Sequence, residues 1–266
     1  MILQSPKRHP IMKSEDFDPP FTKIAPYYDR LMSFVNYPSW VSYIERIILL
    51  NGIKAREILD IACGTGTCLE LWFKRGYRVI GLDKSREMLQ VCAKKFPSWA
   101  IDDGTVQFIC GDLRDFSLPE SVPVVTCLYD SLNYLLTEDE LLSCFKSVFN
   151  NLSSPGLFIF DMNTIHSLKD EWGNQTFERH DGPIHSIWEN SYDPVTRIST
   201  LRITLNVRDG KENRIFKELH RERAYPLEVI KNLLAIAGYQ STLYRHLSFQ
   251  PASELDIRIM GVSRKV

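Results

Sequence analysis

Apolar runs and helical segments alternate between residues 57 and 162, and this alternation limits the possible folds most strongly. The apolar runs predict strands at Glu57–Ala62, Tyr77–Leu82, Val106–Cys110, Val122–Leu128 and Gly156–Met162. The intervening segments predict helices at Thr67–Arg75, Ser85–Lys95 and Glu138–Leu152. Helices between successive strands let the strands run parallel and cover both faces of the sheet. We therefore expect an α/β fold built on a parallel sheet.

The segments on either side of this region have different patterns. Residues 1–20 carry four prolines and both charge signs, which predicts a flexible leader. Helical spacing from Tyr27 to Leu50 predicts two helices divided near Pro38. We expect these helices to form a lid on the main domain.

After residue 163 the pattern becomes antiparallel. Leu201 and Ile203 alternate with polar residues, and turn sequences punctuate the region, so Ile184–Arg223 predicts an antiparallel meander. A helix at Pro226–Ala237 and closing strands at Tyr239–Leu247 and Asp256–Ser263 follow. We expect residues 21–165 and 225–266 to form one domain, with residues 166–224 inserted over its site.

The composition excludes several classes of protein. Of the 266 residues, 44% are hydrophobic, and the formal net charge of −1 provides no overall attraction to nucleic acid or acidic membranes. No apolar run approaches the roughly 20 residues that a membrane-spanning helix requires, and the N-terminus lacks the apolar core of a secretory signal. The six cysteines form no Cys-x-x-Cys pair, so we expect buried free thiols, no metal site and a cytoplasmic location.

A glycine-containing turn follows the first predicted strand, in the sequence DIACGTG at residues 60–66. Gly64 and Gly66 let the backbone turn sharply and allow a ligand to approach closely. Ligands of open α/β sheets bind at the carboxyl ends of the strands, where this turn lies. Asp60 can face a cationic amino group there or stabilise the turn through backbone hydrogen bonds.

Acids also follow the next two predicted strands. Asp83 ends the second strand, where a carboxylate can accept hydrogen bonds from ribose hydroxyls. Asp112 follows the third strand and can accept from an adenine amino group, while Met88 and Leu113 can pack on the ring. Each residue alone would also fit a tight turn or a helix cap, but the ordered set predicts a nucleoside-binding site.

A dehydrogenase that binds a dinucleotide would share much of this layout. The dinucleotide fingerprint G-x-G-x-x-G places its third glycine where this chain has Leu69. The Leu69 side chain would crowd a helix packed close over a pyrophosphate, whereas a nucleoside without phosphates does not require that approach. The missing glycine therefore favours S-adenosylmethionine over NAD.

Segments 60–67, 81–89, 110–112 and 128–134 resemble those of class I S-adenosylmethionine-dependent methyltransferases. More closely, the chain resembles the small-molecule branch that includes sugar N-methyltransferases, and this resemblance extends from Tyr27 to Val266. It implies a Rossmann-like seven-stranded sheet flanked by helices, in which only the last strand is antiparallel. It also implies an antiparallel β insertion and S-adenosylmethionine as the cofactor.

The resemblance implies a set of cofactor contacts, with Asp83 at the ribose, Asp112 near adenine and a lid over the cofactor. The full set is Tyr28, Trp40, Asp60, Ala62, Gly64, Gly66, Asp83, Lys84, Met88, Asp112, Leu113 and Tyr129. Ala62 departs from the family pattern, which often has glycine there. Alanine fits if its φ is negative, and we expect that conformation.

The expected reaction is an in-line displacement that transfers the methyl group to N or O of a small-molecule acceptor, which requires alignment and exclusion of water. Tyr27, Tyr129 and His220 are the foremost acceptor-side candidates, and Asn133, His166 and His185 are further polar candidates. The resemblance implies that Tyr129 lies where the acceptor approaches. No residue is assigned as a catalytic base.

Other functions remain open at this stage. A nucleic-acid or protein methyltransferase is one alternative, although an amino-group methylase of nucleic acid would have an Asn/Asp-Pro-Pro-Tyr/Phe segment after the fourth strand. This chain has the sequence YDSL there, at residues 129–132, so nucleic acid is disfavoured as a partner. A non-catalytic S-adenosylmethionine-binding module is the other alternative, and a homodimer is possible.

Overall fold

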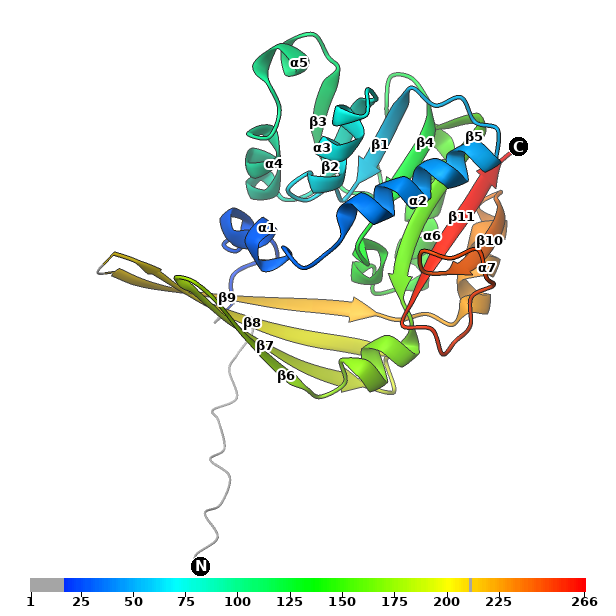
Figure 1. The fold of residues 1–266 in the computed structure, drawn as a ribbon. Coiled ribbons are helices and arrows are strands. Elements are labelled where there is room, and N and C mark those ends of the chain that lie inside the picture. The colour runs from blue at the N-terminus through cyan, green and yellow to red at the C-terminus, as the bar shows by residue number, and fades with distance from the viewer. Residues whose placement is uncertain (1–16, 211) are drawn as a thin grey trace, which may run out of the picture.

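The computed structural model describes residues 17–210 and 212–266, which form two β-sheets (Figure 1). The larger sheet has the strand order β10-β11-β5-β4-β1-β2-β3. Its strands are β1 (Glu57–Ile61), β2 (Arg78–Asp83), β3 (Val106–Cys110), β4 (Val122–Cys127), β5 (Leu152–Asn163), β10 (Gln240–Arg245) and β11 (Arg258–Lys265). Only β11 runs antiparallel to its neighbours in this sheet, so the expected seven-stranded fold is confirmed.

Helices cover both faces of this sheet. On one face lie α2 (Tyr37–Leu50), α3 (Thr67–Lys74), α4 (Arg86–Ala93) and α5 (Ser98–Asp102), and on the other lie α6 (Glu138–Asn151) and α7 (Leu227–Ile236). The remaining helical segments are α1 (Tyr28–Leu31), which packs with the smaller sheet, and the short turns η2 (Ala25–Tyr27), η3 (Ser131–Tyr134) and η4 (Ser167–Glu171). Residues of β5 alternate between two apolar cores, as the pleat requires. Leu157 and Ile159 pack with α2 and α3, whereas Phe158 and Phe160 pack with α6 and α7.

Two helices of the main domain begin with side-chain caps. The Ser85 hydroxyl accepts a 3.1 Å hydrogen bond from the Met88 N–H at the start of α4. Thr137 and Glu140 form a reciprocal capping box at the start of α6. Pro38 lies in the first turn of α2, where a proline needs no N–H partner, so the division between the N-terminal helices precedes it.

The smaller sheet is antiparallel and has the order β6-β7-β8-β9. Its strands are β6 (Thr176–Asp181), β7 (Ile184–Asp193), β8 (Ile198–Asp209) and β9 (Glu212–Arg223). It lies across the carboxyl ends of the parallel strands (Figure 1). The expected meander from Ile184 to Arg223 is therefore present, but β6 begins the sheet earlier than the sequence predicts.

Other features differ from the sequence-based expectations. The expected flexible leader covers residues 1–20, of which residues 1–16 lie outside the described residues. The described remainder contacts β9, because the Asp18 N–H donates to the Lys217 carbonyl over 2.8 Å. All six cysteines are free, but Cys110 is exposed and Cys63 is only half-buried, so the expected burial holds for the other four. Within residues 17–210 and 212–266, no helix combines the length and apolar character needed to span a membrane.

Candidate functional site

A cavity of about 1030 Å³ lies between the carboxyl ends of the parallel strands and the smaller sheet. Strand-end residues, including Asp60, Asp83 and Tyr129, line one side. Leu201 and His220 of the smaller sheet line the other side. The two halves of the molecule therefore share one site.

The two glycines of the turn after β1 have different roles. Gly64 borders the cavity with a φ of +56°, and a Cβ there would meet no atom within 4 Å. It therefore leaves open space for a ligand close to the backbone. Gly66 has a φ of +74°, and a Cβ there would lie 2.1 Å from the Cys92 Sγ. Gly66 thus permits close packing against α4 and does not line the cavity.

The expectation of a negative φ at Ala62 is wrong. Its φ is +54°, in the left-handed region that glycine adopts more readily. The turn leaves little freedom here, because the N–H of the next residue, Cys63, donates to the Leu82 carbonyl of β2 over 3.0 Å. Ala62 lines the cavity, as expected.

Asp83, at the end of β2, lines the cavity next to the turn. Its carboxylate accepts hydrogen bonds from the Gly64 N–H at 2.7 Å and the Ser85 N–H at 2.8 Å. Burial raises the pKa of Asp83 even though these hydrogen bonds oppose the shift. Each carboxylate oxygen retains a lone pair, so the group can still accept hydrogen bonds from a vicinal diol such as that of ribose.

Asp60 also lines the cavity but is 3% exposed. Its Oδ1 accepts a 2.6 Å hydrogen bond from the Thr126 hydroxyl of β4. Burial raises its pKa to about 7, while the Thr126 bond opposes this shift. A cationic ligand group beside Asp60 would favour its ionised form.

Asp112 has a different electrostatic environment. Arg114 donates to both of its carboxylate oxygens at 2.9 and 2.6 Å, and Lys84 lies 3.5 Å away. The Arg114 hydrogen bond lowers the Asp112 pKa to about 2. Asp112, Lys84, Met88 and Leu113 all line the cavity. This end of the cavity thus combines a fixed carboxylate with apolar walls.

The N-terminal lid candidates separate into two groups. Tyr28 lines the cavity. Trp40 is 5% exposed and packs against Tyr129 and His246, and it is not among the described lining residues. Tyr27 packs on Phe216 and is likewise absent from the described wall. The structure does not bring Trp40 or Tyr27 to the cavity because their rings fill apolar packing sites.

Of the polar acceptor-side candidates, some line the cavity and others do not. Tyr129 lines the cavity, and its hydroxyl donates to the Met32 Sδ over 3.4 Å. Asn133 is fully buried, and its side-chain amide hydrogen-bonds to backbone groups of Asn163 in β5 and Arg223 in β9. It therefore links η3 to these two strands. His166 pairs with Asp170, and His185 pairs with Glu178. Neither histidine is among the described residues on the cavity wall.

His220 is the one predicted histidine that the structure places on the described cavity wall. Its Nδ1 lies 3.0 Å from the Tyr134 hydroxyl, and its Nε2 lies 3.1 Å from the Glu218 Oε2. Glu218 is fully buried and also accepts backbone N–H groups from residues 21–24. If the His220 Nε2–H donates to Glu218, the unprotonated Nδ1 accepts a hydrogen bond from the Tyr134 hydroxyl.

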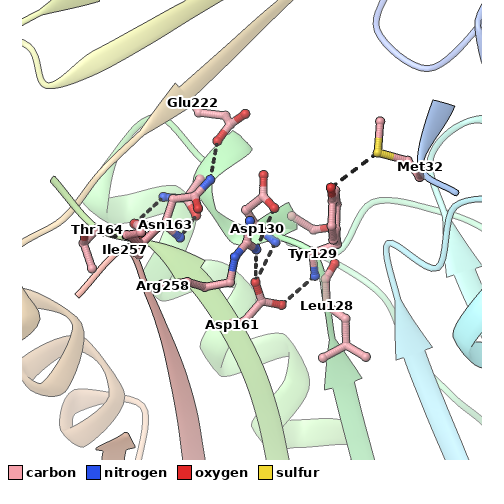
Figure 2. Close-up of polar contacts among 12 residues, drawn as sticks. Met32, Leu128, Tyr129, Asp130, Asp161, Asn163, Thr164, Glu222, Ile257 and Arg258 are labelled. Atoms are coloured by element: carbon pink, nitrogen blue, oxygen red, sulfur yellow. Dashed lines mark hydrogen bonds and ion pairs between the residues drawn. The ribbon is translucent and has the colours of Figure 1, made fainter. Parts of the chain in front are cut away.

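A buried ionic network lies at the ends of β4, β5 and β11 (Figure 2). Arg258 pairs with Asp130 at 2.7 Å and with Asp161. Asp161 accepts the backbone N–H groups of Tyr129 at 2.5 Å and Asp130 at 3.0 Å. These two donors have φ values of +62° and +53°, so Asp161 holds a strained non-glycine turn at the cavity.

Sequence reasoning missed several residues of this region. The missed residues that line the cavity are Asp130, Tyr134, Asn163, Glu222 and Arg258, and Asp161 and Glu218 support them. One available signal was the period-two spacing of Glu218, His220 and Glu222, which places three polar side chains on one face of β9.

The geometry defines a nucleoside-binding α/β site whose residues fit S-adenosylmethionine. Gly64 leaves room at the backbone, Asp83 can accept from a ribose diol, and Met88 and Leu113 offer apolar walls. Leu69 is fully buried and occupies the position where a dinucleotide fold requires glycine. These observations favour a nucleoside cofactor without a pyrophosphate.

Comparisons with known proteins agree with this class. Residues 58–156 match the family model described as a methyltransferase domain. The putative methyltransferase YqeM of Bacillus subtilis is 32% identical over 220 residues, covering 81% of this chain and 85% of that protein. A dTDP-3-amino-3,4,6-trideoxy-alpha-D-glucopyranose N,N-dimethyltransferase of Streptomyces venezuelae is 29% identical, covering 70% and 76% of the two chains.

Solved structures give the same result. An S-adenosylmethionine-dependent methyltransferase from Clostridium acetobutylicum superimposes with a TM-score of 0.81 at 30% identity, covering 91% of this chain and 97% of that one. Streptomyces venezuelae DesVI shares the fold, with a TM-score of 0.74 at 21% identity, covering 92% and 99% of the two chains. The chain belongs to the S-adenosylmethionine-dependent methyltransferases, and S-adenosylmethionine is its cofactor.

Proposed function

We propose that this enzyme transfers a methyl group to N or O of a small molecule bound between the main sheet and the smaller sheet. The observation that carries the proposal is the shared cavity of about 1030 Å³, lined by strand-end residues and by the inner face of the smaller sheet. The insertion at residues 166–224 then covers the acceptor. The relatives that methylate dTDP-amino sugars support a small-molecule acceptor.

The strand order supports a division of the cavity into two halves. Asp112, Asp83 and the glycine turn follow β3, β2 and β1, and we assign them to the cofactor. Tyr129 follows β4, and Asn163 ends β5, on the opposite side of β1. We assign this second half to the acceptor. The proposed methyl-transfer point therefore lies near the boundary between β1 and β4.

The protein's part in the reaction is to bind, align and exclude water. Bound S-adenosylmethionine supplies an electrophilic methyl group on a sulfonium centre. Asp83 binds the ribose, and Met88 and Leu113 pack on the adenine. His220, held by Glu218, fixes the Tyr134 hydroxyl on the acceptor side. Positioning of this kind supplies much of the rate enhancement in a displacement with a good leaving group.

The test uses the purified full chain and S-adenosylmethionine with a radiolabelled methyl group. Calorimetric titration first measures cofactor binding, and incubation with a metabolite extract then measures transfer. We expect label in acid-soluble small molecules. Label confined to precipitated protein or nucleic acid would overturn the small-molecule proposal, and binding without any transfer would support a non-catalytic binding module instead.

A further inference from the structure

The acceptor half of the cavity contains an unusual excess of carboxyl groups. Asp130, Asp161 and Glu222 lie together with one cation, Arg258, at the ends of β4, β5, β9 and β11 (Figure 2). The Arg258 guanidinium already contacts both Asp130 and Asp161. Asp130 and Glu222 line the cavity, whereas Asp161 is fully buried behind it. The cavity wall therefore presents negative charge that Arg258 does not fully neutralise.

A neighbouring amide adds an unpartnered acceptor. Asn163 lines the cavity with only 4% exposure, and its Nδ2 donates to the Glu222 Oε2 over 3.2 Å. Its Oδ1 is buried without a hydrogen-bond partner among the described residues. A buried acceptor without a partner is costly, so a donor from a ligand would be favourable here. The Asp130 and Glu222 carboxyl groups and the Asn163 side chain thus border one part of the cavity.

We propose that Asp130, Glu222 and the Asn163 Oδ1 form a subsite for the ammonium group of the acceptor, so that the methylated atom is an amine nitrogen. This inference rests on the proposed function and names its substrate class. An ammonium has N–H donors and no acceptor, which matches this wall. Before transfer the ammonium releases one proton to the Glu222 carboxylate, and the freed nitrogen lone pair attacks the methyl carbon. The methyl–sulfur bond then breaks and S-adenosylhomocysteine leaves. A hydroxyl carries one donor and no charge, so it would leave acceptors unpaired. An anionic acceptor would face repulsion, because Arg258 is engaged by two carboxylates.

Electrostatics support this assignment. Burial raises the Glu222 pKa to about 8, with repulsion from Asp130 as the second cause. Burial likewise raises the Asp130 pKa, while Arg258 opposes the shift. Burial is the main cause of both shifts, and a neighbouring carboxylate adds to each of them, Asp130 for Glu222 and Asp161 for Asp130. A bound cation would favour the ionised form of these carboxyl groups and so offset the cost of burying them.

The test uses matched probes in the complex saturated with S-adenosylhomocysteine. Cyclohexylamine, which is protonated at pH 7, and cyclohexanol have the same ring and differ in the group under test. Calorimetric or ligand-observed NMR titration measures both. We expect the ammonium to bind about tenfold tighter or more, as charge-assisted hydrogen bonds predict. Equal binding of the two probes, or no binding of the ammonium, would overturn the subsite.

Two variants then test which carboxylate causes the preference for the ammonium probe. Glu222→Gln keeps the shape of the side chain, and we expect it to lose the ammonium preference without changing S-adenosylhomocysteine affinity. Glu171→Gln, which removes another carboxylate on the cavity wall, should keep the preference. Weaker S-adenosylhomocysteine binding by Glu222→Gln would assign this carboxylate to the cofactor and overturn the proposal. If the unmodified protein fails to bind S-adenosylhomocysteine at all, the proposed function itself fails.

Discussion

The Asp83 carboxylate accepts a 2.7 Å hydrogen bond from the backbone N–H of Gly64, so the acid of the second strand holds the turn that follows the first. The same carboxylate faces the cavity. It therefore shapes the glycine turn and remains available to accept hydrogen bonds from a ligand. A single side chain thus connects the conformation of the turn to the cavity wall.

Replacing Asp83 with alanine removes both functions. We expect Asp83→Ala to weaken S-adenosylmethionine binding by about 100-fold, because charge-assisted hydrogen bonds to the ribose hydroxyls and to the turn are lost. Calorimetric titration measures this change. Asp102→Ala, at an exposed position on α5, serves as the control and should bind normally. An unchanged affinity in Asp83→Ala would remove the ribose assignment.

Gly66 tests the packing role of the second glycine. We expect Gly66→Ala to lower the free energy of unfolding by roughly 2 kcal/mol or more, from overpacking against Cys92 and the left-handed φ. Gly76→Ala is a matched control, because its φ is +86° but a Cβ there meets no atom within 4 Å. Urea unfolding compares the two. Equal losses would show that contact with Cys92 contributes nothing.

At Ala62 we expect the opposite substitution, from alanine to glycine, to stabilise the protein. Its φ of +54° strains alanine but not glycine. We expect Ala62→Gly to raise the free energy of unfolding by about 0.5–1 kcal/mol, since relief of strain exceeds the added freedom of the unfolded chain. Ala93→Gly, at the last residue of α4, should instead destabilise the protein, because glycine there gives the unfolded chain more freedom without relieving strain. Destabilisation in both variants would argue against strain at Ala62.

The sequence predicted the parts of the fold and site that depend on local pattern. The strand Val106–Cys110 was predicted with its observed limits, and Asp83 was predicted at the cavity, because both follow from periodicity and strand order. The φ of Ala62 could not be predicted, since it depends on how β1 and β2 close the turn. The interior position of Glu218 depends on the register of β9 against β8, which pairs it with Ile203. Period-two spacing can place Glu218 on one face of β9, but it does not say which face turns inward.

Asp60 predicts a pH dependence of stability. Its pKa in the folded protein is raised to about 7 by burial, above its ordinary value of 3.8. The folded state therefore holds a proton that the unfolded state releases, and stability falls as pH rises through this window. The contribution is fully present below pH 3.8 and is lost as pH rises through about 7. Urea unfolding between these limits should show a shallower decline for Asp60→Asn, and an unchanged slope would contradict the raised pKa.

Glu218 links the smaller sheet to the N-terminal segment. Its Oε2 accepts the Phe21 N–H at 2.7 Å, and its Oε1 accepts three further backbone N–H groups from residues 22–24. We expect Glu218→Ala to lower the free energy of unfolding by about 3 kcal/mol or more, because buried donors lose their partner. Hydrogen exchange should increase at residues 21–24. Glu212→Ala, at an exposed position on the same strand, should leave both measurements unchanged.

The same variant should also weaken the cofactor site, although Glu218 is not among the described residues on the cavity wall. The Phe21 carbonyl accepts a 2.7 Å hydrogen bond from the Ser85 hydroxyl, two residues beyond Asp83. Phe21 and Ile24 line the cavity, so release of this segment opens the wall beside the ribose position. We expect a severalfold loss of S-adenosylmethionine affinity in Glu218→Ala. Faster exchange at residues 21–24 with unchanged affinity would mean that this segment covers the cavity without contributing to cofactor binding.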